Sequence, residues 1–423
     1  MSGKIGNNPY RASGVVACAA GGGGAIDWCT TAKTSPFTAS AGEGYFVNTC
    51  GGVITVTLPA SPSAGDMVAL KDYKSTWATA CKKATLANNS EPINGFCGCV
   101  GLDTIGQSIT VIYVDATQGW LDINDSTANL TGEQFLTATG GDAIVTCGDY
   151  KTHIFTGNGC FAVSSVSGTA AENEVDYVVV ASGGGGNSVI TGGGGAGGFQ
   201  VSNSIGMPVA SPLANDDGVT VTETTYPIVV GAAGAAACSC GGNVSSFATV
   251  PSAGGGAPGP GANNAGNPGG SGSGAAWRDS PGTGAGGSGN TPPTDPPQGE
   301  NGGSNAPNNT SGGGGGAAAA GSNNSQTGGI GSYIADGFVG PTAPSYGSPG
   351  PVSNTRYFAG GGAGANRTGS TATAAGGGGT GGSYTPGVAG GAGCTNTGGG
   401  GGSGGPAGGQ GGAGIVMIRY KYQ

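Results

Sequence analysis

Runs of consecutive glycine fill the second half of the sequence and restrict its possible folds more than any other feature. Glycine accounts for 98 of 423 residues, roughly three times its usual share. Because glycine loses the most backbone entropy on ordering, such runs need a strong compensating structure. The runs do not follow a strict period of three, which argues against collagen. The longest ones in this region are Gly183–Gly186, Gly192–Gly195, Gly254–Gly256, Gly312–Gly316, Gly360–Gly362, Gly376–Gly379 and Gly398–Gly402.

A bundle of polyglycine II helices is one structure that compensates this cost. Such a helix is extended and left-handed with about three residues per turn, and it has no internal hydrogen bonds. Without side chains, neighbouring helices approach closely and bond to one another through the backbone. We therefore predict that residues 183–423 form a glycine-rich domain of polyglycine-II-type helices with loops, closed by the glycine-free strand Ile415–Tyr420. A flexible Gly/Ser linker is the alternative; the low charged fraction, 8%, and the glycine-only runs argue against it.

The preceding residues alternate in the manner of β-strands. Val53–Leu58 and Ile109–Val114 are rich in β-branched residues, and Asn94-Gly95 is a tight-turn signal. Residues 37–126 thus predict a β-module of sandwich or barrel type. The predicted fold class is all-β: small β-sandwich or barrel-like modules followed by the glycine-rich domain.

Residues 127–182 predict a separate β-hairpin connector domain. The turn Gly157–Gly159 lies between the predicted strands Lys151–Phe155 and Phe161–Val163, and a further strand, Val175–Val180, leads into the first glycine run. A strand pair is also expected inside the glycine-rich domain, from Val219–Thr222 and Tyr226–Val230.

Charge and hydropathy argue against several classes of partner. The net charge is −9 and Lys and Arg do not cluster, which argues against nucleic-acid binding. No apolar run approaches the ~20 residues of a membrane-spanning helix, so membrane insertion is not expected. The N-terminal residues lack an apolar core of signal-peptide length. We therefore expect the protein to be made and folded in a cytoplasm, with no secretion signal of its own.

The residues that carry chemistry are sparse, and we predict that the protein is not an enzyme. Its single histidine, His153, lies in a predicted strand, where a satisfied structural side chain is expected. The run Gly192–Gly198 lacks the Lys and the helix of a phosphate loop. Asp122–Ser126 lacks the Gly and distal Glu of a calcium loop. Spacing alone leaves open a pair of carboxylates for glycoside cleavage.

The eleven cysteines do not have the spacing of a metal site. Cys97/Cys99 and Cys238/Cys240 form Cys-x-Cys pairs, whereas zinc sites usually use Cys-x2-Cys or a His partner. We predict no metal and no cofactor. We expect the cysteines to act as small buried hydrophobes, with disulfides formed after release from a cell as the alternative.

Two stretches resemble proteins of tailed bacteriophages. "YFVNTCGGVITVTLPASPSAGDMVALKDY", "INGF" and "VIYVDATQGW", within residues 37–126, resemble a module of phage fibre proteins from marine bacteria, cyanophages included. "GDYKTHIFTGNGCFAVSSV" and "VDYVVVASGGGG" resemble marine phage proteins with a glycine-rich domain. The resemblance implies a homotrimeric fibre in the virion. Residues 1–36 would attach it to other virion proteins, and a frayed terminus is the alternative for them.

The resemblance further implies that the glycine-rich domain binds a receptor on the host surface, a glycan or an outer-membrane protein. Aromatic residues and Arg between the runs are the candidate contacts, since these types anchor interfaces; filling gaps between glycine helices is the alternative. The candidates are Trp277, Arg278, Tyr333, Phe338, Tyr346, Arg356, Tyr357, Phe358, Arg367 and Tyr384. Other hypotheses are a virion component without a receptor, such as a head or neck fibre or a capsid decoration, and a glycan-degrading tail spike.

Overall fold

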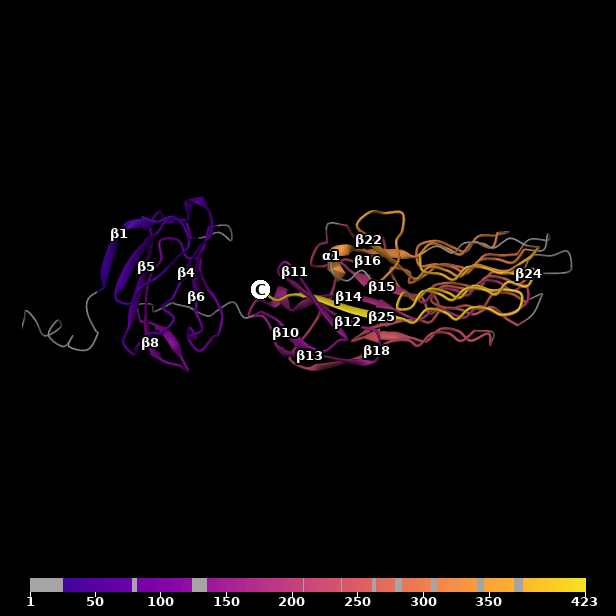
Figure 1. Ribbon diagram of the computed structural model, residues 1–423, viewed down its shortest axis with the longest axis horizontal. Helices are drawn as coiled ribbons and strands as arrows, with labels where there is room; N and C mark the ends of the chain where they lie inside the picture. The colour runs from indigo at the N-terminus through magenta and orange to yellow at the C-terminus, as the bar shows by residue number, and fades with distance from the viewer. Residues whose placement is uncertain are drawn as a thin grey trace, which may run out of the picture. The chain divides into compact units, whose positions relative to one another are not determined.

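The computed structural model divides the chain into two compact units, Met1–Gln134 and Phe135–Gln423 (Figure 1). Each is treated by itself below. The residues that the structure describes are 26–77, 82–123, 135–207, 209–236, 238–260, 264–277, 284–305, 310–323, 325–340, 346–368 and 376–423.

The first unit is a sandwich of two β-sheets. A five-stranded sheet has the order β1-β3-β5-β8-β9, and a four-stranded sheet has the order β2-β4-β6-β7. The strands are β1 Asp27–Lys33, β2 Phe37–Thr38, β3 Glu43–Val47, β4 Ile54–Thr57, β5 Met67–Asp72, β6 Ala84–Ala87, β7 Val100–Leu102, β8 Ser108–Asp115 and β9 Gly119–Asp122. A short 3-10 helix, Thr49–Gly51, precedes β4.

The chain alternates between these two sheets for its first six strands. Consequently β1, β3 and β5 are parallel neighbours in one sheet, and β2, β4 and β6 are parallel neighbours in the other. Parallel strands need a crossover connection, and here each crossover passes through the opposite sheet. The strands β7, β8 and β9 then join antiparallel. The predicted sandwich is confirmed. The alternation of side chains along each strand predicts the strands, but it does not reveal that the chain crosses from one sheet to the other after each of the first five strands.

The core of the first unit consists of side chains that alternate inward from both sheets. Val68, Leu70 and Val111 face Val56 and Leu86 across the sandwich, all of them buried. The fully buried Trp77 and Trp120 complete the core. The core is thus built from the alternating positions that predicted the strands.

The Asn94-Gly95 turn is confirmed. Both residues have positive φ, 50° and 77°, as a tight hairpin turn of this type requires. Ile93 and Phe96 exchange both of their backbone hydrogen bonds across it.

The second unit begins with two sheets and continues into the glycine bundle. A seven-stranded sheet has the order β11-β12-β25-β14-β15-β16, with β17 paired to β14, and a five-stranded sheet has the order β10-β13-β18-β19-β20. The strands are β10 Thr137–Thr139, β11 Ala143–Cys147, β12 Tyr150–Phe155, β13 Gly159–Ser165, β14 Glu174–Val180, β15 Phe199–Ser202, β16 Ala214–Asn215, β17 Val219–Thr220, β18 Thr225–Val229, β19 Ser245–Phe247, β20 Val250–Ser252 and β25 Ile415–Lys421.

The remaining elements are short. They are the 3-10 helix Ala170–Asn173, β21 Ser332–Ala335, α1 Asp336–Val339, β22 Thr355–Phe358, β23 Asn366–Thr368 and β24 Ser383–Thr385. In this described part of the chain no helix is long and apolar enough to cross a membrane.

The strand β25 closes the second unit, as the sequence predicts. It lies between β12 and β14 and is antiparallel to both, with Ile415 opposite Val180. Alternate side chains of β25 enter two cores. Ile418 and Tyr420 pack between the two sheets, whereas Met417 packs on the opposite face of the larger sheet, under α1, β21 and β22. The glycine-rich residues and residues 135–182 therefore share one sheet, and the boundary predicted at residue 182 does not separate two units.

Two predicted strand pairings are wrong. The strands β12 and β13 flank the Gly157–Gly159 turn but do not pair, because β12 bonds to β11 and β25 and β13 bonds to β10 and β18. Likewise β17 pairs with β14, and β18 pairs with β13 and β19, instead of with each other. The other predicted boundary, at residue 36, lies after β1, so residues 27–33 are part of the first unit's sheet; residues 1–25 are outside the described residues.

The glycine runs form a laterally bonded bundle with a period of three. Gly193 N donates to Gly312 O, and three residues later Ala196 N donates to Gly315 O. The residues between them bond to other neighbours: Gly194 N and Gly197 N donate to the segment 398–401, and Gly195 N and Gly198 N to the segment 253–256. Each direction repeats after three residues, as in a polyglycine II helix. The ordered bundle is confirmed, and the linker alternative is wrong.

The bundle has no room for side chains inside the runs. A Cβ at Gly314 would lie 2.0 Å from Gly194 O, and one at Gly400 would also lie 2.0 Å from that oxygen. A Cβ at Gly378 would lie 2.0 Å from Gly361 O. Such distances are far below van der Waals contact, so glycine is required at these positions by close backbone approach.

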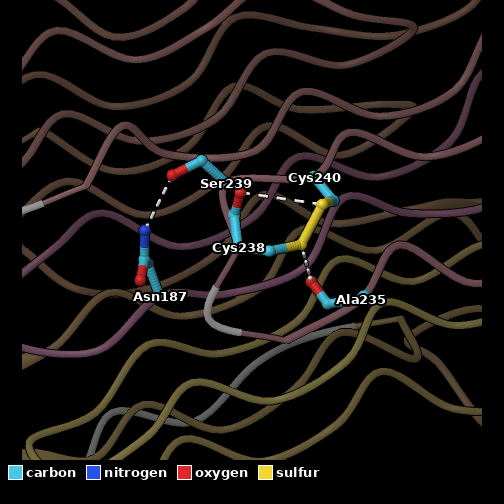
Figure 2. The surroundings of a disulfide bond; sticks show 5 residues. All are labelled: Asn187, Ala235, Cys238, Ser239 and Cys240. Carbon is cyan, nitrogen blue, oxygen red and sulfur yellow. Dashed lines mark hydrogen bonds between the residues drawn. A yellow bond between two sulfur atoms is a disulfide. The ribbon is translucent and has the colours of Figure 1, made fainter.

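The cysteines are not the buried hydrophobes that the sequence predicts. In the described part of the chain no free cysteine is buried; Cys50, Cys97, Cys99, Cys160 and Cys394 are exposed. Cys238 and Cys240 form a disulfide beside the run Gly183–Gly186, where Gly185 N donates to Cys240 O (Figure 2). Asn187, which follows that run, donates from Nδ2 to the Ser239 hydroxyl between the two cysteines (Figure 2). The disulfide alternative is thus the correct one for this pair.

Candidate functional site

The end of the glycine bundle farthest from the sheets is the first place where candidate contact residues meet. In Figure 1, β24 lies at this end, opposite the sheets that contain β12, β14 and β25. The strand β23 pairs with β24 in parallel, with Asn366 opposite Ser383. We call the region around Trp277, β23 and β24 the bundle tip.

Trp277 and Arg367 form a cation–π pair at the bundle tip. The guanidinium carbon of Arg367 lies 5.4 Å from the Trp277 ring centre. Trp277 is nine-tenths buried, and its backbone N–H donates to Ile190 O at 3.1 Å. Its indole Nε1 has no hydrogen-bond partner. Arg367 is exposed, so the pair presents a cation whose position is fixed by a buried ring.

Exposed apolar side chains lie beside this pair. Tyr384 on β24 is 52% exposed, and Val189 and Val388 are each 39% exposed. Val189 N donates to Gly405 O, and a Cβ at Gly405 would touch the backbone of Ser383 and Tyr384. Val388 exchanges backbone hydrogen bonds with Ser383. The two valines were absent from the sequence-based candidates, because an isolated valine in a glycine-rich segment gives no signal of exposure.

The second group of candidates lies near the sheets. Figure 1 places β22 and α1 beside β15 and β16, away from β24. Phe338 and Phe358 are buried against the large sheet, and Tyr357 is 4% exposed. These three side chains fill the core, which favours the gap-filling alternative over receptor contact for them.

The other members of this group are partly exposed and engaged within the unit. Tyr333 packs on Tyr357 with ring centres 5.3 Å apart. Arg356 Nε donates to Asp336 Oδ1 at 3.0 Å. Tyr346 packs against the core under α1. Arg278, the remaining candidate, lies outside the described residues.

His153 has the structural role that the sequence predicts. The side chain is fully buried, with Nδ1 2.6 Å from Gly140 O and Nε2 3.1 Å from the Tyr420 hydroxyl. Nδ1–H therefore donates to the carbonyl, and Nε2 accepts from the phenol. Burial lowers the pKa of His153 and raises the pKa of Tyr420 to about 12, which keeps both groups neutral.

The glycine-rich part of the chain matches a known family. The family model described as a glycine-rich domain covers residues 156–421, from the end of β12 through nearly the whole of β25. The chain belongs to the glycine-rich domain family. No curated protein is similar to the chain. The matched residues thus include the whole glycine bundle and the bundle tip.

Proposed function

We propose that this protein is a structural fibre protein of a tailed-phage virion, and that its glycine-rich domain binds a receptor on the host surface through the bundle tip. The observation that carries the proposal is the distribution of side chains along the bundle. Backbone packing excludes side chains from the runs, whereas the tip presents Arg367 over Trp277 and the exposed Tyr384. A rigid stalk with recognition groups at its end suits adhesion.

The chemistry of the bundle tip supports a binding role. Trp, Tyr and Arg are the residue types that dominate binding energy at interfaces. Arg367 donates planar hydrogen bonds to carboxylate or phosphate groups, and Tyr384 offers a ring for stacking. Bacterial surface glycans and outer-membrane proteins offer anionic groups for Arg367 and flat surfaces on which the Tyr384 ring can stack. The protein then acts by binding and carries out no reaction.

The test is a binding measurement with the full chain. Lipopolysaccharide and outer-membrane proteoliposomes from a panel of bacterial strains are immobilised separately, so that glycan and protein receptors are distinguished. We expect binding to at least one strain and a loss of roughly 30-fold or more for Arg367→Ala and Tyr384→Ala, the range of hot-spot residues. Val352→Ala is the matched control, since this exposed residue lies just before β22, near the sheets.

Two outcomes would overturn the proposal. One is the absence of binding to every strain, which leaves a virion component without a receptor. The other is equal binding by wild type and both tip variants, which places the receptor contact elsewhere. Release of reducing ends from the lipopolysaccharide during the same incubation would identify a glycan-degrading spike instead.

A further inference from the structure

Three aromatic side chains lie together on the outer face of the five-stranded sheet of the first unit. Trp28 is on β1, Phe46 is on β3, and Tyr73 directly follows β5. The ring centres of Trp28 and Phe46 are 5.0 Å apart, and those of Phe46 and Tyr73 are 6.4 Å apart. None of the three belongs to the core between the sheets. We call these three side chains the aromatic platform.

Glycine at position 44 lets the Trp28 indole lie flat on the sheet. Trp28 is paired with Gly44 across β1 and β3. A Cβ at Gly44 would lie 2.6 Å from Cδ2 and 2.9 Å from Cε2 of the indole, which are the two atoms that its fused rings share. Because ring atoms surround this bond within the plane, the Cβ would meet the face of the indole. One face of Trp28 therefore covers Gly44, and the side chain is still 37% exposed.

Hydrogen-bonding groups border the aromatic platform. The strand pairing continues from Phe46 through Lys71 on β5 to Ser108 on β8, so these residues share the outer face. Ser108 is exposed. Lys71 Nζ donates to Gly106 O, which holds the ammonium in place, and an ammonium has three donors in all. The rings thus lie beside polar groups that can orient a ligand.

We propose that the aromatic platform is a carbohydrate-binding site, separate from the bundle tip. A sugar ring combines a face of C–H groups with hydroxyl groups around its rim. The C–H face packs on exposed aromatic rings such as those of Trp28 and Tyr73, and the hydroxyl groups bond to Lys71 and Ser108. The site lies in the first unit, so this inference goes beyond the receptor contact proposed for the second unit and does not depend on it.

The size of the aromatic platform favours a sugar over a protein partner. Three aromatic side chains bury at most roughly 750 Å², and part of the area of Trp28 and Phe46 is already covered within the unit. A standard protein interface buries ~800 Å² on each partner. The platform alone is therefore too small for a protein interface, whereas one or two sugar rings need far less area.

The charge of the chain argues against nucleic acid as the ligand. Bases also stack on aromatic rings, but the proteins that bind single strands add a positively charged groove for the phosphates. The chain has a net charge of −9, and the row from Phe46 to Ser108 contains one cation, Lys71. A carbohydrate needs no such groove.

The experiment measures carbohydrate binding after the bundle tip has been inactivated. Every protein is the full chain with Arg367→Ala/Tyr384→Ala. The probes are O-antigen and capsular polysaccharides, freed of lipid, from the panel of strains named above, and affinity electrophoresis gives the Kd. We expect at least one polysaccharide to bind, and a further Trp28→Ala or Tyr73→Ala to weaken binding about tenfold or more.

Two further substitutions serve as controls. Trp28→Phe keeps an aromatic ring and should retain most of the affinity. Val53→Ala shortens a side chain that is 44% exposed directly before β4, in the other sheet, and should bind as the parent protein does. Far-UV circular dichroism checks that each variant is folded.

A second measurement does not depend on the folding of platform variants. In the protein with the inactivated tip, the polysaccharide should reduce hydroxyl-radical labelling of Trp28 and Tyr73. Labelling of Ile144, which is 53% exposed on β11 in the second unit, should stay constant.

Three outcomes would overturn the inference. They are no binding of any polysaccharide to the protein with the inactivated tip, equal affinity of this protein and its Trp28→Ala variant, and protection of Trp28 by an oligothymidylate but by no polysaccharide. The last outcome would identify a site for single-stranded nucleic acid. None of these results affects the receptor test of the bundle tip, because both tip side chains are already replaced.

Discussion

Arg419 on β25 and Asp176 on β14 form an ion pair inside the second unit, with Nη1 3.7 Å from Oδ2. The two side chains are 6% and 0% exposed, and the guanidinium carbon lies 3.8 Å from the centre of the Tyr150 ring. The Ser202 and Ser204 hydroxyls also donate to Asp176. Desolvation lowers the pKa of Arg419, and the charge of Asp176 opposes that shift. The pair joins a strand that precedes the glycine runs to the strand that follows them.

Removal of Arg419 is expected to destabilise the second unit strongly. Arg419→Ala leaves the Asp176 carboxylate buried without its counter-ion, which costs about 3–5 kcal/mol in comparable sites. In an Asp176→Asn background the same change should cost less, because no buried charge is left. Chemical denaturation of the four proteins gives the coupling free energy. Equal costs in both backgrounds would mean that Arg419 acts by packing alone.

A side chain inside a glycine run is expected to disrupt the bundle. Gly314→Val places a Cβ 2.0 Å from Gly194 O and breaks the bonds to Gly362 and Gly329. Stranded backbone groups cost about 1–3 kcal/mol each, so we expect a loss of at least ~2 kcal/mol. Gly168→Val is the control, because nothing lies within 4 Å of a Cβ there. Amide exchange localises the effect, and runs that exchange as fast as a random coil in wild type would contradict the bundle itself.

Acid is expected to weaken the second unit through His153. Burial lowers the folded pKa of this side chain below 6.5, and nearby Lys151 lowers it further. Just below pH 6.5, His153 is therefore protonated to a greater extent in the unfolded chain than in the folded chain. The free energy of unfolding should fall as pH drops below about 6.5, by at most about 1.4 kcal/mol per pH unit.

The acid effect of His153 is separable from that of the carboxylates. The pKa values of Glu172 and Asp142 are lowered from 4.5 and 3.8, so their contributions are lost only at more acidic pH. His153→Gln is expected to be less stable than wild type near neutrality but to have a flat profile between pH 7 and about pH 5. A wild-type profile that is equally flat would contradict the assignment.

Alkali is expected to act through Tyr420. Its folded pKa is raised to about 12, with burial as the main cause, whereas an unfolded tyrosine titrates near 10. The stabilisation is complete below pH 10 and is lost as pH rises from about 10 to about 12. Tyr420→Phe should lose about 1 kcal/mol near neutrality, since the hydrogen bond to His153 disappears. It should also show a smaller decrease between pH 9 and pH 11 than wild type does.

Local signals in the sequence predicted much of the fold. Alternating β-branched residues predicted β4, β8 and β14, and Asn94-Gly95 predicted its turn, because each depends on a few adjacent residues. The pairing of β12 was missed because its partner β25 lies at residues 415–421. A turn such as Gly157–Gly159 reverses the chain but does not determine which sheet the next strand joins.

The candidate site was predictable only in part, for a related reason. Tyr384 and Phe358 occur in similar glycine-rich surroundings, yet one is half exposed and the other is fully buried. The difference arises from which runs become neighbours, and runs of identical glycines carry no information about their partners. The exposure of Trp28 in the first unit was equally hidden, because it depends on the parallel pairing of β1 with β3.

The central place of β25 determines when the second unit folds during synthesis. The strands β12 and β14 leave the ribosome early, but the strand that fits between them comes after all the glycine runs. At about 5–20 residues per second, roughly 10 to 50 s separate the synthesis of β14 from that of β25. During this interval two apolar strand edges have no partner. Nascent chains stalled in the glycine runs should therefore aggregate or bind chaperones, and the second unit acquires its protease resistance only after residue 421 has left the exit tunnel.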